Sequence, residues 1–420
     1  MTIQFARRMQ HTRPSDIREI LVKTSGRDYI SFAGGVPDPE LFPVEQLSEL
    51  AQKVLREHPA RALQYGPTPG LLPLREKVVA LMAEIGVATD SDHVQIVTGA
   101  QQGIGLSGTV FLDPGDRVIV ERPTYSAAIN AFDQFQPNYL DVKNDDEGPD
   151  FEQVARLLHG GQPVKLAYVI PNFQNPSGRL WSQARREAFL DTFSGTEALI
   201  IEDDPYGQLA FRGTPPRPLK AIDWDERVIY LGSFSKVLCP GLRVGWIVAS
   251  SEIMTQYNLA KQNHDLHTSA FDQELINAYL EEEDLSAQIK RLRDSYALRC
   301  QVMLTALERE FPEGTRFTKP EGGLFTWVEL SESINARDVL KLAMQEKVSF
   351  IPGNGFFATR PQNNTMRLNF SAMGPEKIEQ GIAILGRIVH DLLDNTNEPQ
   401  RAQRSLREKN KSLRTPRSLR

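Results

Sequence analysis

Short runs of apolar, mostly β-branched residues recur between residues 94 and 248, and helix-like stretches such as 183–193 lie between several of them. The runs show little polar alternation, which is typical of strands buried on both faces of a largely parallel sheet. Strands and helices that alternate in this way indicate an α/β domain. The pattern predicts a large domain with a mostly parallel central sheet, with candidate strands at 94–97, 117–120, 166–170, 198–201, 227–231 and 244–248.

The pattern of the sequence changes after about residue 275. A charged helical stretch is followed by a mixture of strand-like and helix-like segments, which predicts a smaller α+β domain. These segments are 286–310, 325–328, 336–346, 366–370 and 375–393. We expect the N-terminal residues to pack with this domain. The predicted division is an N-terminal segment 1–60, a large domain 61–275, a small domain 276–398 and a basic, disordered tail 399–420.

Charge and cysteine content exclude several classes of protein. The 420-residue chain has a formal net charge of -6 and two cysteines, Cys239 and Cys300, so that no disulfide framework is implied and a reducing cytoplasm is expected. No stretch approaches the roughly 18 apolar residues of a membrane span, and the start of the chain lacks the apolar core of a signal peptide. We therefore predict no nucleic-acid partner and no membrane partner.

Residues 401–420 differ from the rest, because they contain eight basic residues and one acidic residue, Glu408, and repeat a unit of the type Arg-Ser-Leu-Arg. Such a segment buries too little apolar surface to order itself. We expect a solvated tail, and attraction to a polyanion or to an anionic membrane is the alternative.

The most informative loop, 233–246, follows the run that ends at residue 231 and reads Ser-Phe-Ser-Lys-Val-Leu-Cys-Pro-Gly-Leu-Arg-Val-Gly-Trp. A lysine such as Lys236 becomes a nucleophile for carbonyl carbons when desolvation or nearby positive charge lowers its pKa. Ser233, Ser235 and Arg243 can hold a phosphate. Together these groups suit a phosphorylated aldehyde cofactor, whereas the alternative is a surface lysine in a loop.

Two other loops also follow candidate strands: Glu-Asp-Asp-Pro-Tyr at 202–206 and Pro-Asn-Phe-Gln-Asn-Pro-Ser-Gly at 171–178. A buried carboxylate such as Asp203 is costly unless it is paired, and a protonated pyridine nitrogen is one suitable partner. Tyr206 and the Asn175 amide can donate to the phenolic oxygen of the same ring. The alternatives are that Asp203 caps a turn and that the Asn175 segment is a plain turn.

A fourth loop, Thr-Gly-Ala-Gln-Gln-Gly at 98–103, leads from a candidate strand into a helix whose free N–H groups can bind a phosphate. Gly99, Ala100 and Gln101 form this turn. Its glycine spacing is not the dinucleotide-binding fingerprint, so that the loop alone is weak evidence for an anion site. Tyr125, in Arg-Pro-Thr-Tyr, can stack on a planar ring, and a core aromatic is the alternative.

In this order the four loops resemble the fold-type I, pyridoxal-phosphate-dependent class I and II aminotransferases, and the likeness is strongest to the subgroup of 2-aminoadipate, kynurenine and aromatic aminotransferases. The resemblance covers about residues 12–393, and the Ser-Phe-Ser-Lys to Gly-Leu-Arg-Val-Gly-Trp string is its most specific part. It implies the fold of pyridoxal-phosphate transferases of type I, pyridoxal phosphate as the cofactor, and no metal ion in the site.

The resemblance also implies how the cofactor is held. Lys236 forms a Schiff base with it and later moves a proton, while Asp203 pairs with the ring nitrogen. Asn175 and Tyr206 contact the phenolic oxygen, and Tyr125 stacks on the ring. The groups implied at the phosphate are Gly99, Ala100, Gln101, Ser233, Ser235 and Arg243, with Tyr65 of a neighbouring subunit, which implies a homodimer with shared active sites.

Substrate contacts are implied in the same way. Arg367, in Met-Arg-Leu-Asn-Phe, matches the arginine that clamps the substrate α-carboxylate in a bidentate pair, with Asn175 close to it. Gly35, in the segment 30–43, is implied to lie beside the substrate. Arg18, in a short helix near 15–19, is implied to reach a distal carboxylate such as that of glutamate or 2-aminoadipate, and a solvent-facing arginine is the alternative.

The implied reaction is transamination between an L-amino acid, aromatic, 2-aminoadipate-like or branched-chain, and a 2-oxo acid, with glutamate and 2-oxoglutarate as one pair. A β-lyase, decarboxylase or synthase reaction at the same site stays open, because Arg367 does not decide which bond breaks. A transcription regulator with an aminotransferase-like domain is the alternative from another class. Such regulators carry an N-terminal helix-turn-helix, for which we expect no room, because the resemblance begins near residue 12.

Overall fold

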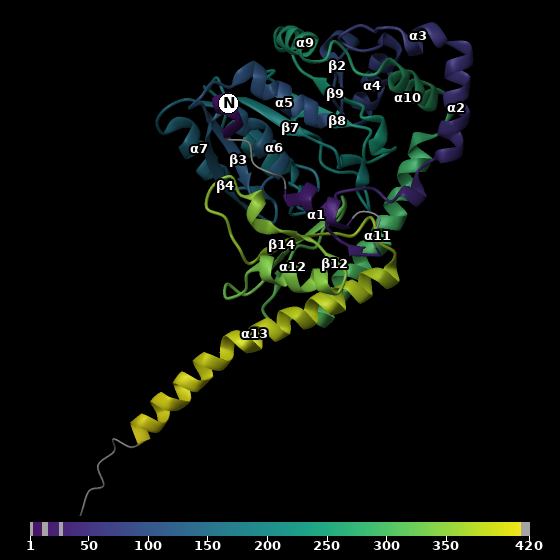
Figure 1. Cartoon of the computed structure of the whole chain (residues 1–420). Helices are drawn as coiled ribbons and strands as arrows, with labels where there is room; N and C mark the ends of the chain where they lie inside the picture. Colours follow the sequence, from purple (N-terminus) through teal and green to yellow (C-terminus); the bar gives the residue numbers. More distant parts are fainter. Residues whose placement is uncertain (1–2, 11–15, 25–27, 413–420) are drawn as a thin grey trace, which may run out of the picture.

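The computed structural model describes residues 3–10, 16–24 and 28–412, with side chains except at 7, 16, 17 and 396–412. Its centre is one large sheet whose strands are β2 (Val94–Val97), β3 (Arg117–Arg122), β4 (Asn138–Asp145), β5 (Gly148–Pro149), β6 (Val164–Val169), β7 (Leu199–Asp203), β8 (Val228–Ser233) and β9 (Gly245–Val248). The eight strands lie in the order β2-β9-β8-β7-β6-β3-β4-β5. The four central pairs, from β8 to β4, are parallel, and the pairs that involve β9 or β5 are antiparallel. The predicted α/β domain with a mostly parallel sheet is confirmed (Figure 1).

The six predicted strands are present, with ends that differ by up to two residues. The prediction missed β4 and β5. β4 reads Asn-Tyr-Leu-Asp-Val-Lys-Asn-Asp, and only Asp141 and Val142 in it are buried. A search for continuous apolar runs finds strands covered on both faces, whereas β4 lies near the edge of the sheet and keeps polar residues exposed.

Helices pack around the large sheet (Figure 1). They are α4 (Leu72–Glu84), α5 (Ala100–Phe111), α6 (Ser126–Phe132), α7 (Phe151–His159), α8 (Gln183–Asp191), α9 (Ser251–His264) and α10 (Ala270–Glu282). Local chemistry fixes several of their starts. Ser182 caps α8 by accepting a hydrogen bond from the Arg185 N–H, and Asp150 caps α7 by accepting one from the Gln153 N–H, which satisfies N–H groups that have no partner within the helix.

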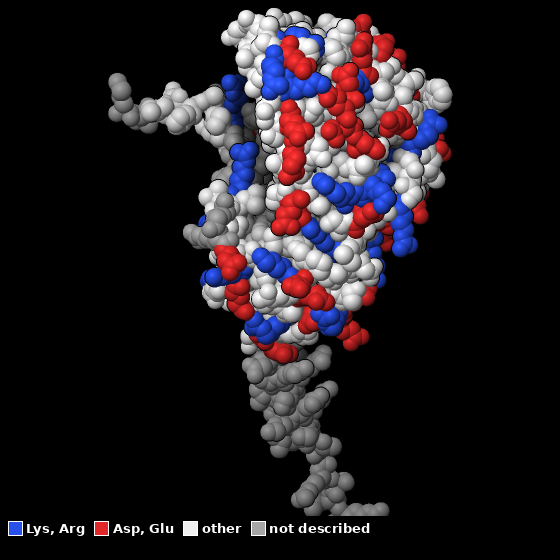
Figure 2. All heavy atoms as spheres, turned by 90° about the vertical axis from the view of Figure 1, so that its right-hand side faces the viewer, with Lys and Arg blue, Asp and Glu red and all other residues white. Residues whose placement is uncertain are grey.

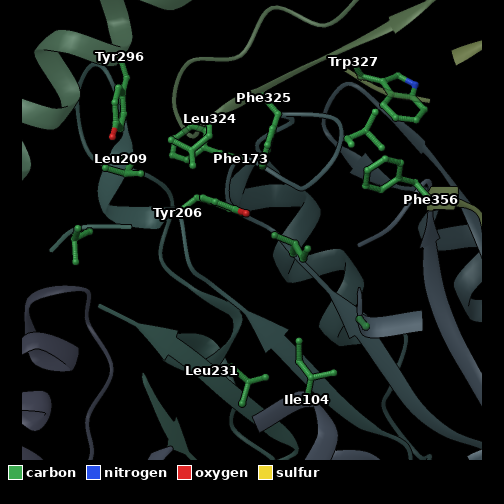
Figure 3. Packing of buried hydrophobic residues seen from close by; sticks show 14 of the residues in the cluster. Ile104, Phe173, Tyr206, Leu209, Leu231, Tyr296, Leu324, Phe325, Trp327 and Phe356 are labelled. Carbon is green, nitrogen blue, oxygen red and sulfur yellow. The ribbon is translucent and has the colours of Figure 1, made fainter. Parts of the chain in front are cut away.

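The small domain is built on an antiparallel sheet of four strands in the order β10-β11-β14-β13. Its strands are β10 (Arg316–Phe317), β11 (Phe325–Glu329), β13 (Ile351–Pro352) and β14 (Thr365–Asn369), and its helices are α11 (Leu285–Glu310), α12 (Ala336–Gln345) and α13 (Pro375–Ser412). Helices α11 and α12 both pack against α13. Apolar side chains such as Trp327 and Phe356 fill the space between this sheet and the large domain (Figure 3).

The N-terminal segment contacts both domains. β1 (Ile30–Ser31) pairs in parallel with β12 (Val348–Ser349) and so joins the small domain. By contrast, α2 (Val44–Glu57) and α3 (Pro59–Leu63) pack against α10. α1 (Asp16–Thr24) lies near β13. Residues 28–43 therefore lead from β12 of the small domain to α2, which packs against α10.

The backbone of α13 continues past residue 398, where we expected a disordered tail to begin, and ends at Ser412. Extending an existing helix costs less than starting one, and this stretch is rich in Arg, Lys, Gln, Glu and Leu, which favour helix. In Figure 1 the end of α13 points away from both domains. Within the described ranges, no helix combines the length and the apolar composition that a membrane span requires.

Basic and acidic side chains are interspersed on the face that carries α2, α10 and α11 (Figure 2). Some of them form ion pairs across elements, such as Lys53 on α2 with Glu282 on α10. Because exposed pairs of this kind contribute only about 0–1 kcal/mol each, the buried core supplies most of the stability of the fold.

Strand direction explains where the predicted loops meet. β6, β7 and β8 are parallel, so that their carboxyl ends lie at one edge of the sheet. β2 is antiparallel to β9, which is antiparallel to β8, and β2 therefore runs in the same direction as β8. The loops after these four strands converge at this edge, which is where open α/β sheets bind their ligands.

Candidate active site

A cavity of about 300 Å³ lies at the carboxyl edge of the large sheet. It is closed from the other side by the segment around Gly35 and by Arg367 of the small domain. Most residues predicted for the site line it: Arg18, Gly35, Ala100, Gln101, Tyr125, Asn175, Asp203, Tyr206, Ser233, Ser235, Lys236, Arg243 and Arg367. Gly99 lies against Arg243 at its margin, and Tyr65 is not among the lining residues.

Lys236 follows β8 and points its amine into this cavity. Its Nζ donates a hydrogen bond to the Gly35 carbonyl oxygen at 2.8 Å. Burial, followed by the positive charges of Arg243 and Arg367, lowers the pKa of Lys236 to about 8. A lysine with such a pKa is partly neutral near neutral pH, which is what attack on a carbonyl carbon requires.

This pKa is testable in the protein without cofactor. Acetic anhydride labels only neutral amines, so that labelling of Lys236 at different pH values reports its titration, with the peptide quantified by mass spectrometry. We expect a midpoint at about 8 in the folded protein. The same peptide in urea-unfolded protein has lost the buried environment and should titrate near 10.4, the ordinary value. Equal midpoints in both states would contradict the structure.

Asp203 ends β7 and is 2% exposed. Its Oδ2 accepts a hydrogen bond from the Tyr168 hydroxyl at 2.6 Å, whereas its Oδ1 is buried with no hydrogen-bond partner among the described residues. Burial raises the pKa of Asp203 to about 7, although the Tyr168 hydrogen bond opposes this shift. A buried carboxylate oxygen without a partner is costly, and a cationic N–H donor on a ligand would satisfy it.

Arg367 joins three distant segments of the chain. Its Nη1 donates to Asn175 Oδ1 at 2.9 Å, and its Nη2 donates to the Ala33 carbonyl oxygen at 2.6 Å. The guanidinium lies over the Phe325 ring, 4.3 Å from its centroid. Burial lowers the pKa of Arg367 to about 10. The side chain therefore stays cationic at neutral pH, and it is held in place in a site that a carboxylate can enter.

Asn175 and Tyr206 complete this side of the cavity. The Asn175 Nδ2 donates to the Tyr206 hydroxyl oxygen at 3.4 Å. Tyr206 is 4% exposed, and its ring meets the Phe325 ring edge to face, as Figure 3 shows. Burial raises the pKa of Tyr206, so that it stays a neutral donor. An amide and a phenol side by side can both donate to one oxygen atom of a ligand.

The opposite end of the cavity suits an anion. Gly99 precedes α5 with φ +75, and a Cβ there would lie 2.3 Å from Arg243 Nη2, so that only glycine lets the guanidinium approach the turn. Arg243 also contacts Ser235 Oγ at 3.4 Å. Ala100 begins α5, whose first N–H groups have no carbonyl partner within the helix. Hydroxyl, guanidinium and helix N-terminus converge, which is a phosphate-binding arrangement.

Sequence reasoning missed two features behind this site. Tyr168 lies in the apolar run 166–170, and the sequence of that run does not indicate that its hydroxyl contacts Asp203. Lys261 is fully buried and pairs with Asp265 at 2.9 Å. Asp265 also accepts from Gln102, which in turn accepts from the Thr98 N–H of the phosphate-type turn. Lys261 and Asp265 are four residues apart, and this spacing in a helix-like segment indicates an ion pair.

Two predicted residues stand apart from the cavity centre. Tyr65 is 79% exposed, and its ring packs edge to face with His267. The contact of Tyr65 with a neighbouring subunit stays a prediction. Arg18 lies on α1, is exposed, and lines the outer part of the cavity, and its role with a distal carboxylate also stays a prediction. Ser15, which begins the predicted helix, lies outside the described residues.

The cavity fits pyridoxal phosphate on three independent points. The unpartnered Asp203 Oδ1 suits the N–H of a pyridinium ring. A partly neutral lysine amine suits an aldehyde carbon. The turn at Gly99, with Arg243 and Ser235, suits a phosphate. A dinucleotide would need a longer anion site than this turn provides.

Comparison with known proteins agrees with this fit. The family model for aminotransferases of class I and II matches residues 27–385. An aromatic-amino-acid aminotransferase 1 of Thermococcus litoralis is 41% identical over 392 residues, which are 92% of this chain and 94% of that protein. A 2-aminoadipate transaminase of Thermus thermophilus is 42% identical over 383 residues, 90% of this chain and 94% of that protein.

Solved structures show the same likeness. The kynurenine aminotransferase of Pyrococcus horikoshii, solved in complex with PMP, is 40% identical to this chain and superposes with a TM-score of 0.88. The match covers 92% of this chain and 97% of that one. With the family model, the relatives and the cavity in agreement, the chain belongs to the class I and II aminotransferases of fold type I and uses pyridoxal phosphate as its cofactor.

Proposed function

We propose that this aminotransferase moves the amino group between an aromatic or 2-aminoadipate-like L-amino acid and a 2-oxo acid, with glutamate and 2-oxoglutarate as one pair. The relatives named for aromatic and 2-aminoadipate substrates support this substrate range. The observation that carries the proposal is the cavity in which the Lys236 amine, the unpartnered Asp203 oxygen and the Arg367 guanidinium face one space. In this arrangement the Lys236 amine can reach the Cα proton, Asp203 can pair with the ring nitrogen of the cofactor, and Arg367 can bind the α-carboxylate.

When bound, pyridoxal phosphate supplies an aldehyde carbon that bonds to amino groups and a cationic ring that accepts electrons. In our proposal, Arg367 binds the substrate α-carboxylate and so fixes the orientation of Cα. The Lys236 Nζ takes the proton from Cα and returns it on the cofactor side, because its pKa of about 8 suits it to both tasks near neutral pH. Asp203 holds the ring nitrogen.

The remaining residues orient and shield the reacting centre in this proposal. Tyr206 and Asn175 donate to the phenolic oxygen of the ring, and Tyr125 stacks on its face. Ser233, Ser235 and Arg243, with the turn at Gly99, Ala100 and Gln101, hold the phosphate. Gly35 borders the substrate, and a Cβ there would lie 2.7 Å from the Phe325 ring, so that a larger residue would push the segment out of the cavity.

A half-reaction screen tests the proposal. The holoenzyme is mixed with each of the twenty amino acids, 2-aminoadipate and kynurenine in separate experiments, and loss of the cofactor's aldehyde-form absorbance is followed. We expect conversion with glutamate and with aromatic amino acids or 2-aminoadipate, and recovery of the band on addition of 2-oxoglutarate. Release of carbon dioxide or ammonia, with the aldehyde-form band retained in the absence of a 2-oxo acid, would instead identify a decarboxylase or a β-lyase.

Arg18 provides a sharper prediction within this substrate range. It is an exposed residue that lines the same cavity as Arg367. We expect Arg18→Ala to lower kcat/KM for glutamate and 2-aminoadipate by about tenfold, the worth of one charge-assisted hydrogen bond, and to change kcat/KM for phenylalanine less than twofold. Arg56→Ala, an exposed arginine on α2, is the control. Equal losses for both substrate classes would contradict the assignment.

We also propose a homodimer with shared active sites. The phosphate end of the cavity is open, because Gln101 and Arg243 are exposed. Leu63 and Tyr65, two positions apart in the chain, expose 71% and 79% of their surfaces, and exposed apolar side chains that lie together are typical of interaction surfaces. Sedimentation equilibrium of the holoenzyme should give twice the chain mass, and a monomer at micromolar concentration would contradict the proposal.

We propose a cytoplasmic location because both cysteines of the chain are free. Both Cys239 and Cys300 are free, and burial raises the pKa of the Cys300 thiol to about 12, which keeps it unreactive. Chains without disulfides are typical of reducing compartments. Cell fractionation with antibody detection checks this assignment.

A further inference from the structure

We propose that Tyr168 is a positioning residue for the cofactor, because its hydroxyl holds one oxygen of Asp203 and leaves the other as the acceptor for the ring nitrogen. The inference rests on the proposed role of Asp203 in the site. Tyr168 does not line the cavity. It acts from behind Asp203, and it is therefore a residue that acts through another rather than on the substrate.

The sheet register brings the two side chains together. Tyr168 on β6 pairs with Ile201 on β7. Side chains two residues apart on a strand point to the same face, so that Asp203 lies on the face that carries Ile201 and Tyr168. The Tyr168 hydroxyl donates to Asp203 Oδ2 at 2.6 Å, and Tyr168 is fully buried. The contact is therefore fixed by backbone pairing rather than by a mobile loop.

Packing fixes the Tyr168 ring as well. Phe132 at the end of α6 meets it edge to face, with ring centroids 5.9 Å apart. With the ring held, the hydroxyl donates to Asp203 Oδ2. The Asp203 carboxyl group can then not rotate freely, and its Oδ1 keeps one direction, into the cavity. Oδ1 has no partner among the described residues, which is the expected state of an acceptor reserved for a bound group.

The same contact affects the charge of Asp203. Burial raises the pKa of this carboxyl to about 7, and the Tyr168 hydrogen bond is the largest opposing effect, ahead of the charge of Lys236. Removing the hydroxyl would therefore raise this pKa further. Protonated Asp203 cannot form an ion pair with a pyridinium ring, so that the pairing would be lost at a higher pH than in the wild type.

A purely structural tyrosine is the competing explanation. In that case Tyr168 donates to Asp203 only because a buried hydroxyl needs an acceptor, and its removal alters stability but no property of the ring nitrogen. The two explanations differ in one respect. If Tyr168 positions Asp203, it affects ligand binding only through the ring nitrogen. The affinity for a ligand that lacks this nitrogen should then not change when the Tyr168 hydroxyl is removed.

The experiment compares two ligands on the apoenzyme. One is pyridoxamine phosphate, which forms no bond to Lys236, and the other is its analogue with a benzene ring in place of the pyridine ring. Dissociation constants are measured by calorimetry for wild type, Tyr168→Phe and Tyr257→Phe. Tyr257 is a matched control, since it is fully buried and its hydroxyl contacts Ser107 Oγ at 2.6 Å, away from the cavity.

We expect Tyr168→Phe to weaken pyridoxamine phosphate about tenfold, the size of one hydrogen bond to a charged group, and to leave binding of the benzene analogue unchanged within about twofold. Tyr257→Phe should change neither. In the holoenzyme, the acid limb of kcat should move to higher pH in Tyr168→Phe, while KM for the amino acid changes less than twofold. In an Asp203→Ala background, where the hydroxyl has lost the carboxylate that it holds, Tyr168→Phe should have no further effect on ligand selectivity.

Equal weakening of both ligands, or no weakening of either, would overturn the positioning role. If Tyr168→Phe does not fold, Tyr168→Met replaces it, because methionine fills irregular space and lacks a donor. The ligand comparison uses no turnover. A failed half-reaction screen would therefore count against the proposed substrates, while the selectivity for the ring nitrogen would still decide the role of Tyr168.

Discussion

Replacement of Lys236 by alanine is expected to lower kcat by at least about 10⁴-fold, while the protein keeps its fold. A positioned side chain that transfers a proton contributes about 10²–10⁴-fold to a reaction rate, and Lys236 is also the amine that binds the aldehyde carbon. The alanine variant loses both contributions. Removing this lysine should cost little stability, because its buried charge is unfavourable in the folded state, as its pKa of about 8 indicates.

The measurement is a single-turnover reaction with glutamate, followed by absorbance. Lys220→Ala is the matched control, because Lys220 is also a largely buried lysine, 11% exposed, but does not line the cavity. Added small primary amines should restore part of the rate of Lys236→Ala, in proportion to their basicity, if proton transfer is the lost step. A Lys236→Ala enzyme with wild-type turnover would remove Lys236 from the mechanism.

The sequence predicts those parts of the site that lie at the carboxyl ends of strands. Asn175 and Lys236 follow β6 and β8, and Asp203 ends β7. These three strands are parallel, so that their carboxyl ends lie at one edge. Once the runs at 166–170, 198–201 and 227–231 are recognised as strands of one sheet, the meeting of these side chains follows. The local motifs then decide which side chain does which chemistry.

Contacts between distant segments could not be predicted in this way. Arg367 donates to Asn175 and to the Ala33 carbonyl oxygen, across 192 and 334 residues of chain. No local pattern specifies such a contact, because it depends on how the small domain and the N-terminal segment close over the sheet. The match of Arg367 to a family motif supplied the residue, but its partners required the structure.

Tyr168 illustrates a different limit. A tyrosine in a buried strand satisfies the hydrophobic pattern whether its hydroxyl meets a carboxylate or a backbone carbonyl. Only the register of β6 against β7 places it beside Asp203. The strand β4 shows the converse, because its polar sequence conceals a strand that the sheet nevertheless accommodates near its edge.

Asp203→Asn is expected to lower kcat about 10³-fold, which corresponds to about 4 kcal/mol of transition-state stabilisation. Asparagine keeps the size of the side chain and can still accept the Tyr168 hydrogen bond, but it carries no charge. The ring nitrogen then has no anionic partner, and the ring is a weaker electron sink. KM for the amino acid should change little, because Arg367 and not Asp203 meets the α-carboxylate in our proposal.

Asp204→Asn is the control for this change. Asp204 is the next residue and is a half-buried acid, yet it accepts from Tyr230 and from the Gly207 N–H and does not line the cavity. Burial raises the pKa of both carboxyls, and each variant replaces one such carboxyl by a neutral amide. A large fall in kcat for Asp203→Asn with a fall of less than tenfold for Asp204→Asn would therefore locate the effect at the ring nitrogen. Equal falls would mean that the acidic cluster acts on stability, and the pairing of Asp203 with the cofactor would have to be withdrawn.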